Sequence, residues 1–413
     1  MQHLDRIVAA QQPQQDVGFK LLNVPNPRQS QTCLYATEIN PRVLIFSQRN
    51  FDLKVFQCWI YEFEDVIAET DGVHLLAPGA WEEAAAAATL IRRVGNGVRR
   101  LRGRAPHVGV IGESQVNQKY DLFFAIFMFP WQLALLERIK NWRSQCGGAV
   151  CLLGEVWVHD VPRVRPWLEL LRDFDQVFVA IKSSVPDVAQ VVGKPCTFLP
   201  LGIDTMRFCP YPNPPTRSID VLSMGRRSDS VHQDLLYLAE KKRIFYLYDV
   251  VRNFSVIDYR EHRAMLANLV KRSRYFISYK HNVNIADVTG GQEAVGARYF
   301  EGAAGGAAMI GIPPDCEEYR AAFDWEDAVI PVPYSPTDIG VILSELDAQP
   351  HRLARVSRKN VVSCLLRHDW AYRWEQILNS VGIEPTPALA ARKAALQKLA
   401  HSISVDTGVQ AME

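Results

Sequence analysis

The chain has 413 residues, of which 48% are hydrophobic and 22% charged, a balance that is ordinary for a globular protein. Its 46 Lys and Arg residues and 45 Asp and Glu residues leave a net charge of +1, so no global field attracts nucleic acid, and we expect no nucleic-acid partner. A chain of this length is expected to divide into two domains of about 200 residues each.

The start of the chain and its cysteines indicate where the protein works. Residues 1–36 begin with a Gln-rich stretch without a secretory signal pattern, and we expect them to form an N-terminal extension. No apolar run reaches the roughly 18 residues that a membrane span needs. None of the eight cysteines forms a Cys-x-x-Cys pair, which argues against a zinc site. The expectation is a cytoplasmic protein without a metal or a resident cofactor.

Short apolar strands alternate with helices in residues 37–200, which we expect to form an N-terminal, Rossmann-like domain. This alternation favours a parallel sheet with helices on both faces. The strands are predicted at 42–46, 107–111, 121–127, 149–153, 176–181 and 196–200, and the helices between them include 81–93 and 131–145.

A proline-rich linker and a second αβ domain follow. Six prolines fall between Pro195 and Pro215, and because proline fixes φ we interpret 201–218 as a stiff linker. A C-terminal domain is predicted over 219–380, followed by a tail over 381–413 with a peripheral helix and a loose end. Its strands are predicted at 219–223, 243–248, 275–278, 307–310 and 328–332, and its helices include 259–272 and 337–347.

Two such halves predict an α/β protein with two doubly wound, Rossmann-like domains that face a central cleft. Ligands of open α/β sheets bind beyond the carboxyl ends of the strands, so we expect the site in this cleft.

The most informative segment is 290–311, where two carboxylates, Glu293 and Glu301, stand eight residues apart. In a continuous helix they would lie about 12 Å apart along the axis. This distance suits a molecule in which a hexose and a ribose are joined by a diphosphate. Charged carboxylates are strong acceptors for sugar hydroxyls. A turn at Gly290 and Gly291 precedes them, and Gly296 would let backbone approach a phosphate closely. The alternative is an amphipathic helix with two solvated glutamates.

Three segments resemble retaining glycosyltransferases of the GT-B fold with the E-x7-E pattern. Besides Glu293 to Glu301, residues 200–210 resemble the segment that links the two domains of these enzymes. Residues 221–227 resemble the first strand of their second domain, which ends in Gly-Arg. The core Gly296-Ala297-Arg298-Tyr299-Phe300-Glu301 and residues 368–374 are most similar to the spore-maturation-type (group 1) branch. The resemblance covers 196–380; the first domain matches only in its αβ pattern.

The resemblance implies that the chain moves a sugar from a nucleotide-sugar donor to a hydroxyl of an acceptor, with retention and without metal. By that resemblance Arg226, next to Gly225, stabilises the departing diphosphate, while Glu293 binds the sugar and Glu301 the ribose. Backbone amides near Gly290, Gly291 and Gly296 would assist. We add Arg298 as a candidate for the diphosphate, because a guanidinium holds phosphate bidentately; a surface ion pair is the alternative. The family's Lys after Gly-Arg is missing here, and Arg227 or His232 is a candidate substitute.

The acceptor is expected in the first domain and is a glycan, a lipid, a protein or a small molecule. Glu155, His159 and Asp160 follow a predicted strand and could orient an acceptor hydroxyl, with His159 as the catalytic candidate, although such a His is more often a satisfied loop residue. Residues 47–50 and 112–115 follow strands in the same way.

A basic run over 92–104 allows peripheral contact with an anionic membrane, but a solvated helix end is the favoured interpretation.

Two rival functions stay open. The missing Lys motivates a GT-B-like nucleotide-binding protein without turnover, and a nucleotide-sugar epimerase could use the same fold. A nucleotide oxidoreductase lacks support because no Gly-x-Gly-x-x-Gly follows a strand.

Overall fold

The computed structural model describes residues 33–36, 41–79, 112–225, 227–249, 254–280, 286–336 and 338–410. From Gln31 onward the chain forms one compact unit. The predicted strand at 107–111, the predicted helix at 81–93, the basic run over 92–104 and the site residue Arg226 lie outside the described residues.

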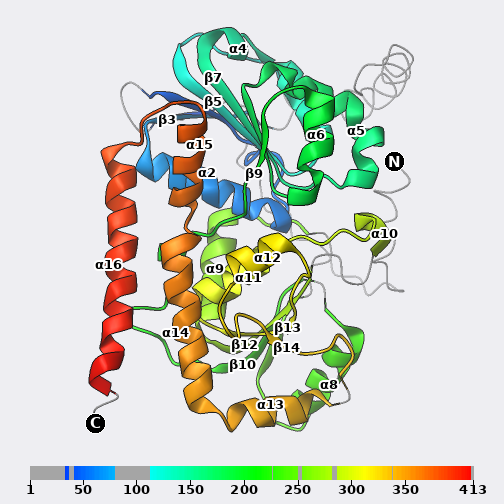
Figure 1. The fold of residues 1–413 in the computed structure, drawn as a ribbon, viewed down its shortest axis with the longest axis vertical. Helices are drawn as coiled ribbons and strands as arrows, with labels where there is room; N and C mark the ends of the chain where they lie inside the picture. The colour runs from blue at the N-terminus through cyan, green and yellow to red at the C-terminus, as the bar shows by residue number, and fades with distance from the viewer. Residues whose placement is uncertain are drawn as a thin grey trace, which may run out of the picture. The chain divides into compact units, whose positions relative to one another are not determined.

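The first sheet has seven strands in the order β1-β3-β2-β5-β7-β8-β9 (Figure 1). Every pair is parallel except β1 with β3. The described sequence-predicted strands of this half are confirmed, whereas β1 and β3 were missed. The strands are β1 Cys33–Ala36, β2 Val43–Phe46, β3 Val73–Ala77, β5 Tyr120–Phe127, β7 Cys146–Leu153, β8 Gln176–Val179 and β9 Cys196–Phe198.

Helices cover both faces of the first sheet, as its continuous apolar strands require. Leu44 and Phe46 of β2 point into a core shared with α5 (Val161–Leu168) and α6 (Val185–Val192). Their neighbours Val43 and Ile45 point the other way, toward α2 (Cys58–Thr70). Short 3₁₀ helices connect these elements at Val55–Gln57, Val158–Asp160, Glu169–Asp173 and Lys182–Ser184.

The helix predicted at 131–145 is wrong. A 3₁₀ helix spans Pro130–Arg138, and Ile139–Lys140 then forms β6, which pairs with β4 (Ser114–Gln115). The pairing with β4 and the left-handed backbone at Asn141, φ 64°, end the 3₁₀ helix before the short α4 (Trp142–Gln145) begins.

The second sheet has five parallel strands in the order β11-β10-β12-β13-β14. Counted along this half, the order is 2-1-3-4-5, a doubly wound arrangement whose switch point lies between β10 and β12. The predicted strands of this half are confirmed. The strands are β10 Ile219–Ser223, β11 Tyr246–Tyr248, β12 Ser273–Tyr279, β13 Ala308–Ile312 and β14 Ile330–Pro331.

Helices again cover both faces. On one face the strands pack with α9 and α11, and on the other with α8 and α13 (Figure 1). The predicted helices at 259–272 and 337–347 are confirmed, and each begins at an aspartate cap, Asp258 and Asp338. The helices of this half are α8 Asp229–Glu240, α9 Tyr259–Lys271, α10 Ala286–Thr289, α11 Ala297–Ala304, α12 Glu317–Ala322, α13 Ile339–Asp347 and α14 Pro350–Arg367.

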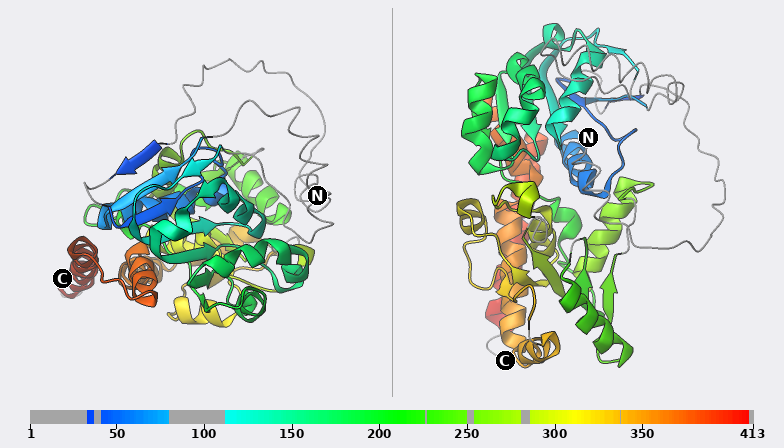
Figure 2. Two further views of the ribbon diagram at one scale, coloured as in Figure 1. Left: turned by 90° about the horizontal axis from the view of Figure 1, so that it is seen from above. Right: turned by 90° about the vertical axis from the view of Figure 1, so that its right-hand side faces the viewer.

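The proline-rich linker contains a short helix, α7 (Thr205–Phe208), capped by Asp204. After α14 the chain forms α15 (Trp370–Ser380) and α16 (Pro387–Gln410). Helix α16 lies beside α14, with apolar side chains of both helices in one core (Figure 2).

Helix α15 packs on the core of the first sheet, a contact that the sequence did not predict. Trp370 stacks on Phe63 of α2 with ring centroids 4.5 Å apart, and Trp374 lies against Phe124 of β5. The domain boundaries themselves stay a prediction.

Gly311 in β13 is a position where a side chain would disrupt the second sheet. Its φ is +148°, and an added Cβ would lie 2.1 Å from the carbonyl oxygen of Ser278 on β12. We expect Gly311→Ala to lower the free energy of unfolding by about 2–4 kcal/mol in urea titrations. The matched control is Gly382→Ala, where φ is +69° but no atom lies within 4 Å, and a loss of about 1 kcal/mol is expected. Equal losses in the two variants would contradict this account.

Candidate active site at the switch point of the second sheet

Gly225 follows β10 at the switch point, and the structure places Arg298 directly on it. Gly225 has φ +77°, and a Cβ there would lie 2.7 Å from Nη2 of Arg298, which sits in the first turn of α11. The amide of Gly225 donates to Oδ1 of Asp249 at 3.0 Å. Gly225 and Arg298, each predicted at the donor diphosphate, therefore come together at one edge of the sheet.

The two candidate substitutes for the missing Lys are engaged in packing around β11. The Arg227 guanidinium lies over the ring of Tyr248, 5.0 Å from its centroid, and Nη2 donates to the carbonyl oxygen of Asp249. The Nδ1 atom of His232 is 2.9 Å from the hydroxyl of Tyr246, and burial together with Arg227 lowers the pKa of His232.

The two glutamates lie on different elements, which corrects the continuous helix considered from the sequence. Helix α11 begins at Ala297, with Gly296 as its extended N-cap, φ −78° and ψ 160°. Glu293 lies in the loop before the helix, so the separation of about 12 Å along one axis does not apply. The glycine turn is confirmed, because Gly290 and Gly291 have φ of +60° and +81°.

Glu301 is buried on α11 and one of its two oxygens is held by an arginine. Nη1 of Arg263 on α9 donates to Oε1 of Glu301. No hydrogen bond from the described residues reaches Oε2, and the side chain keeps 12% of its surface exposed. One carboxylate oxygen is thus fixed while the other is open to a ligand.

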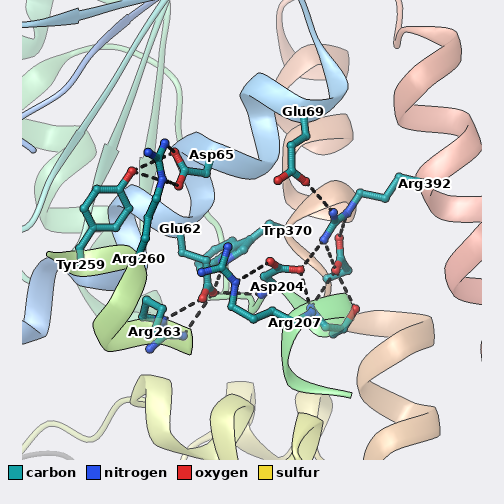
Figure 3. A network of polar contacts seen from close by, with 12 residues as sticks. Glu62, Asp65, Glu69, Asp204, Arg207, Tyr259, Arg260, Arg263, Trp370 and Arg392 are labelled. Atoms are coloured by element: carbon teal, nitrogen blue, oxygen red, sulfur yellow. Dashed lines mark hydrogen bonds and ion pairs between the residues drawn. The ribbon is translucent and has the colours of Figure 1, made fainter. Parts of the chain in front are cut away.

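Arg263 is itself held by a second carboxylate, Glu62 of α2, through Nε at 2.8 Å and Nη2 at 3.2 Å (Figure 3). Burial disfavours the charged guanidinium, but the carboxylates of Glu62 and Glu301 outweigh burial and raise the pKa of Arg263 well above its ordinary value. Arg263 is therefore charged at neutral pH.

Glu293 is held by a lysine and a backbone amide at the edge of a cavity. Lys280, directly after β12, donates to Oε1, and the amide of Asp315 donates to Oε2 at 2.5 Å. The cavity measures about 300 Å³, the lower end of the range for small-molecule sites. Its lining residues are Ser183, Gly291, Gln292, Glu293, Asp315, Cys316 and Glu318.

Loops of the first half contact the loop that carries Glu293. Gln292 bridges two of them, because its Oε1 accepts from the amide of Val158 at 2.7 Å and its Nε2 donates to Ser183 at 2.6 Å. A Cβ on Gly290 would lie 2.6 Å from Nδ1 of His159. The structure thus brings His159 to the Gly290 turn.

The other candidates of the first half have partners of their own. Glu155 accepts from the indole of Trp157 at 2.8 Å, and Asp160 pairs with Arg163 at 2.7 Å and lies 3.6 Å from Nε2 of His159. In the predicted 47–50 segment, Arg49 is buried between Glu64 and Asp65 and donates to the hydroxyl of Tyr259 at 2.7 Å. The 112–115 segment contributes β4 to the small two-stranded sheet.

Three residues of this arrangement were missed from the sequence: Glu62, Arg263 and Lys280. Glu62 lies in an aromatic-rich run, Trp59 to Phe63, and nothing in this run indicates that its carboxylate is buried. Its partner Arg263 is 201 residues away, so only the fold reveals the pair.

The described residues contain no group of three or more His, Cys, Asp or Glu side chains placed to hold a metal ion. Across the same ranges, no helix is both long and apolar enough to cross a membrane.

One family model matches part of the second half of the chain. A family model described as glycosyl transferase-like matches residues 238–379, which include both glutamates. None of the curated proteins compared with the chain matches it.

Similar solved structures include the Anabaena protein HepE in complex with UDP-glucose, with 11% identity, a TM-score of 0.46, and coverage of 83% of this chain and 100% of that one. An α,α-trehalose-phosphate synthase (UDP-forming) from Burkholderia vietnamiensis has 9% identity and a TM-score of 0.48, covering 86% and 99% of the two chains. A glycosyltransferase from Rickettsia africae has 10% identity and a TM-score of 0.45, covering 83% and 98%. These likenesses concern the fold alone.

The predicted fold class is confirmed by the two doubly wound, largely parallel sheets. Over residues 238–379 the chain matches the glycosyl transferase-like family, the class of enzyme that the sequence predicted.

Proposed function

We propose that the chain transfers a sugar from a nucleotide-sugar to an acceptor hydroxyl, with the donor bound at the carboxyl edge of the second sheet. The observation that carries the proposal is the convergence of Gly225, Arg298 and the start of α11 at the switch point, with the half-open carboxylate of Glu301 on the same helix. A switch point is where open α/β sheets bind nucleotides. The match of residues 238–379 supports the same reaction class.

Each part of the site has a chemical task in this proposal. Arg298, Arg226 and the amides at the Gly296 cap stabilise the negative charge that develops on the departing diphosphate. Oε2 of Glu301 accepts hydrogen bonds from ribose hydroxyls, and Glu293 accepts them from the sugar at the cavity. These groups supply the charge stabilisation without a metal ion in the proposed mechanism.

The acceptor is proposed to enter from the first half, beside His159 and the Gly290 turn. His159 is then the group nearest to the acceptor hydroxyl and the candidate to orient it. Retention of the anomeric configuration is proposed from the E-x7-E resemblance, and product analysis by NMR tests it, since an inverted product contradicts it.

Donor consumption tests the proposal as a whole. The wild type is incubated with glucose and N-acetylglucosamine esters of UDP, GDP, ADP and dTDP, with and without simple sugar acceptors, and nucleoside diphosphate release is measured. We expect release from donors of one base, and a loss of at least about tenfold in kcat/KM in Glu301→Ala. Binding without release would favour a non-catalytic nucleotide-binding protein, and isomerised donor without release would favour an epimerase; either result contradicts the transferase.

A further inference from the structure

Arg263 is a buried arginine that has no assigned role in the proposed reaction. Only 3% of its side chain is exposed, and it lies between two carboxylates that come from elements far apart in the sequence. Its Nε and Nη2 donate to Glu62 of α2, and its Nη1 donates to Oε1 of Glu301 on α11. The guanidinium is planar, so these three bonds fix both carboxylates in one frame.

Glu62 is held by two further groups besides Arg263. Its Oε1 accepts from the amide of Asp204 at 3.0 Å and from the indole of Trp370 at 3.1 Å, in addition to Arg263 (Figure 3). The ring of Phe208 lies 4.9 Å from the Arg263 guanidinium carbon. Arg263 therefore has a rigid support in α2, the linker and α15, and cannot change orientation without breaking several buried bonds.

The cluster of Glu62, Arg263 and Glu301 has one more negative than positive side chain. Two carboxylates, Glu62 and Glu301, share one guanidinium, and within the described part of the chain no hydrogen bond reaches Oε2 of Glu301. A carboxylate oxygen accepts hydrogen bonds only. A ligand with hydroxyl donors, such as the vicinal diol of a ribose, supplies what this oxygen lacks.

We propose that Arg263 is a positioning residue that sets the orientation of Glu301 for the ribose diol, with Glu62 as its anchor. This inference rests on the proposed function. Glu301 is held at a single oxygen by a single side chain, so loss of Arg263 frees its rotamer and weakens a hydrogen bond whose strength depends on geometry. The recognition of the ribose hydroxyls by α11 therefore depends on a carboxylate of α2.

The test compares UDP, GDP, ADP and CMP with their 2′,3′-dideoxy analogues by isothermal titration calorimetry. Hydrogen bonds to a charged acceptor make the wild type prefer the ribonucleotide that it binds by roughly tenfold to a hundredfold over the analogue. In Arg263→Lys we expect this preference to fall to within about threefold, because one ammonium cannot hold both carboxylates in the same geometry. Glu62→Gln, which keeps the acceptor for Asp204 and Trp370, is expected to give an intermediate preference.

A matched control on the same helix is Arg260→Lys. Arg260 is exposed, pairs with Asp65 and makes no contact with Glu301, so the preference should stay at the wild-type value. The ratio of two dissociation constants measured on one variant does not depend on how much of the sample is folded, so a general loss of stability cannot imitate the effect. A wild-type ratio retained in Arg263→Lys would overturn the inference. Failure of the wild type to bind any of these four nucleotides would instead contradict the proposed function.

Discussion

Replacing Glu62 with alanine is expected to lower the free energy of unfolding by about 3–5 kcal/mol, because it leaves a buried arginine without its main partner. Arg263 would lose two of its three hydrogen bonds while remaining almost fully buried. The amide of Asp204 and the indole of Trp370 would also lose their acceptor. Since buried donors without partners each cost free energy, the losses act in the same direction.

The matched control is Glu69→Ala on the same helix. Glu69 pairs with Arg392 but is 58% exposed at its side chain, so its loss should change stability by no more than about 1 kcal/mol. Urea unfolding followed by circular dichroism measures both variants. A Glu62→Ala protein as stable as Glu69→Ala would show that the cluster around Arg263 does not stabilise the fold.

The second large effect is on activity. Arg298→Ala is expected to lower kcat/KM for sugar transfer by about 10²–10³, the loss that follows removal of one group aimed at developing charge. Arg298 is at the start of α11, and its guanidinium lies on Gly225. The diphosphate is proposed to leave at this point. Arg298→Lys keeps the charge but not the bidentate geometry, so an intermediate rate is expected.

Stability and rate must be separated for this variant. Arg298 is in the first turn of its helix, so the fold should survive the change, and thermal unfolding provides the check. Arg272→Ala is the control, because the hydrogen bonds of the Arg272 side chain to the described residues go to Asn268 of α9, so kcat/KM should stay unchanged. An Arg298→Ala enzyme within about threefold of the wild type would remove this residue from the donor site.

The parts of the site that depend on local sequence were predicted well. The glycine turn at Gly290 and Gly291 follows from the backbone preferences of these two residues. The sequence does not show whether Glu293 belongs to the helix, because no residue before Gly296 marks the start of the helix. The extended conformation of Gly296 decides this, and it places Glu293 in a loop.

The parts that depend on distant residues could not be predicted. Glu62 lies among aromatic residues on α2, and its burial is tolerated only because Arg263 compensates its charge from 201 residues away. Trp370 similarly packs on Phe63 of the first half, although it follows the second half in sequence. A single sequence carries no signal for such pairs. The helix predicted at 131–145 was wrong for a related reason, because the pairing of β6 with β4 is also non-local.

The most direct test of the account is a thermal-shift panel with UDP, GDP, ADP, CMP and dTDP on the wild type and on Glu301→Ala. A ligand at 100 times its dissociation constant adds about 2.7 kcal/mol of stability, so a selective shift is measurable. The account predicts that nucleotides of one base stabilise the wild type and that Glu301→Ala loses most of this shift. No shift with any nucleotide, or an equal shift in both proteins, would contradict a donor site at Glu301.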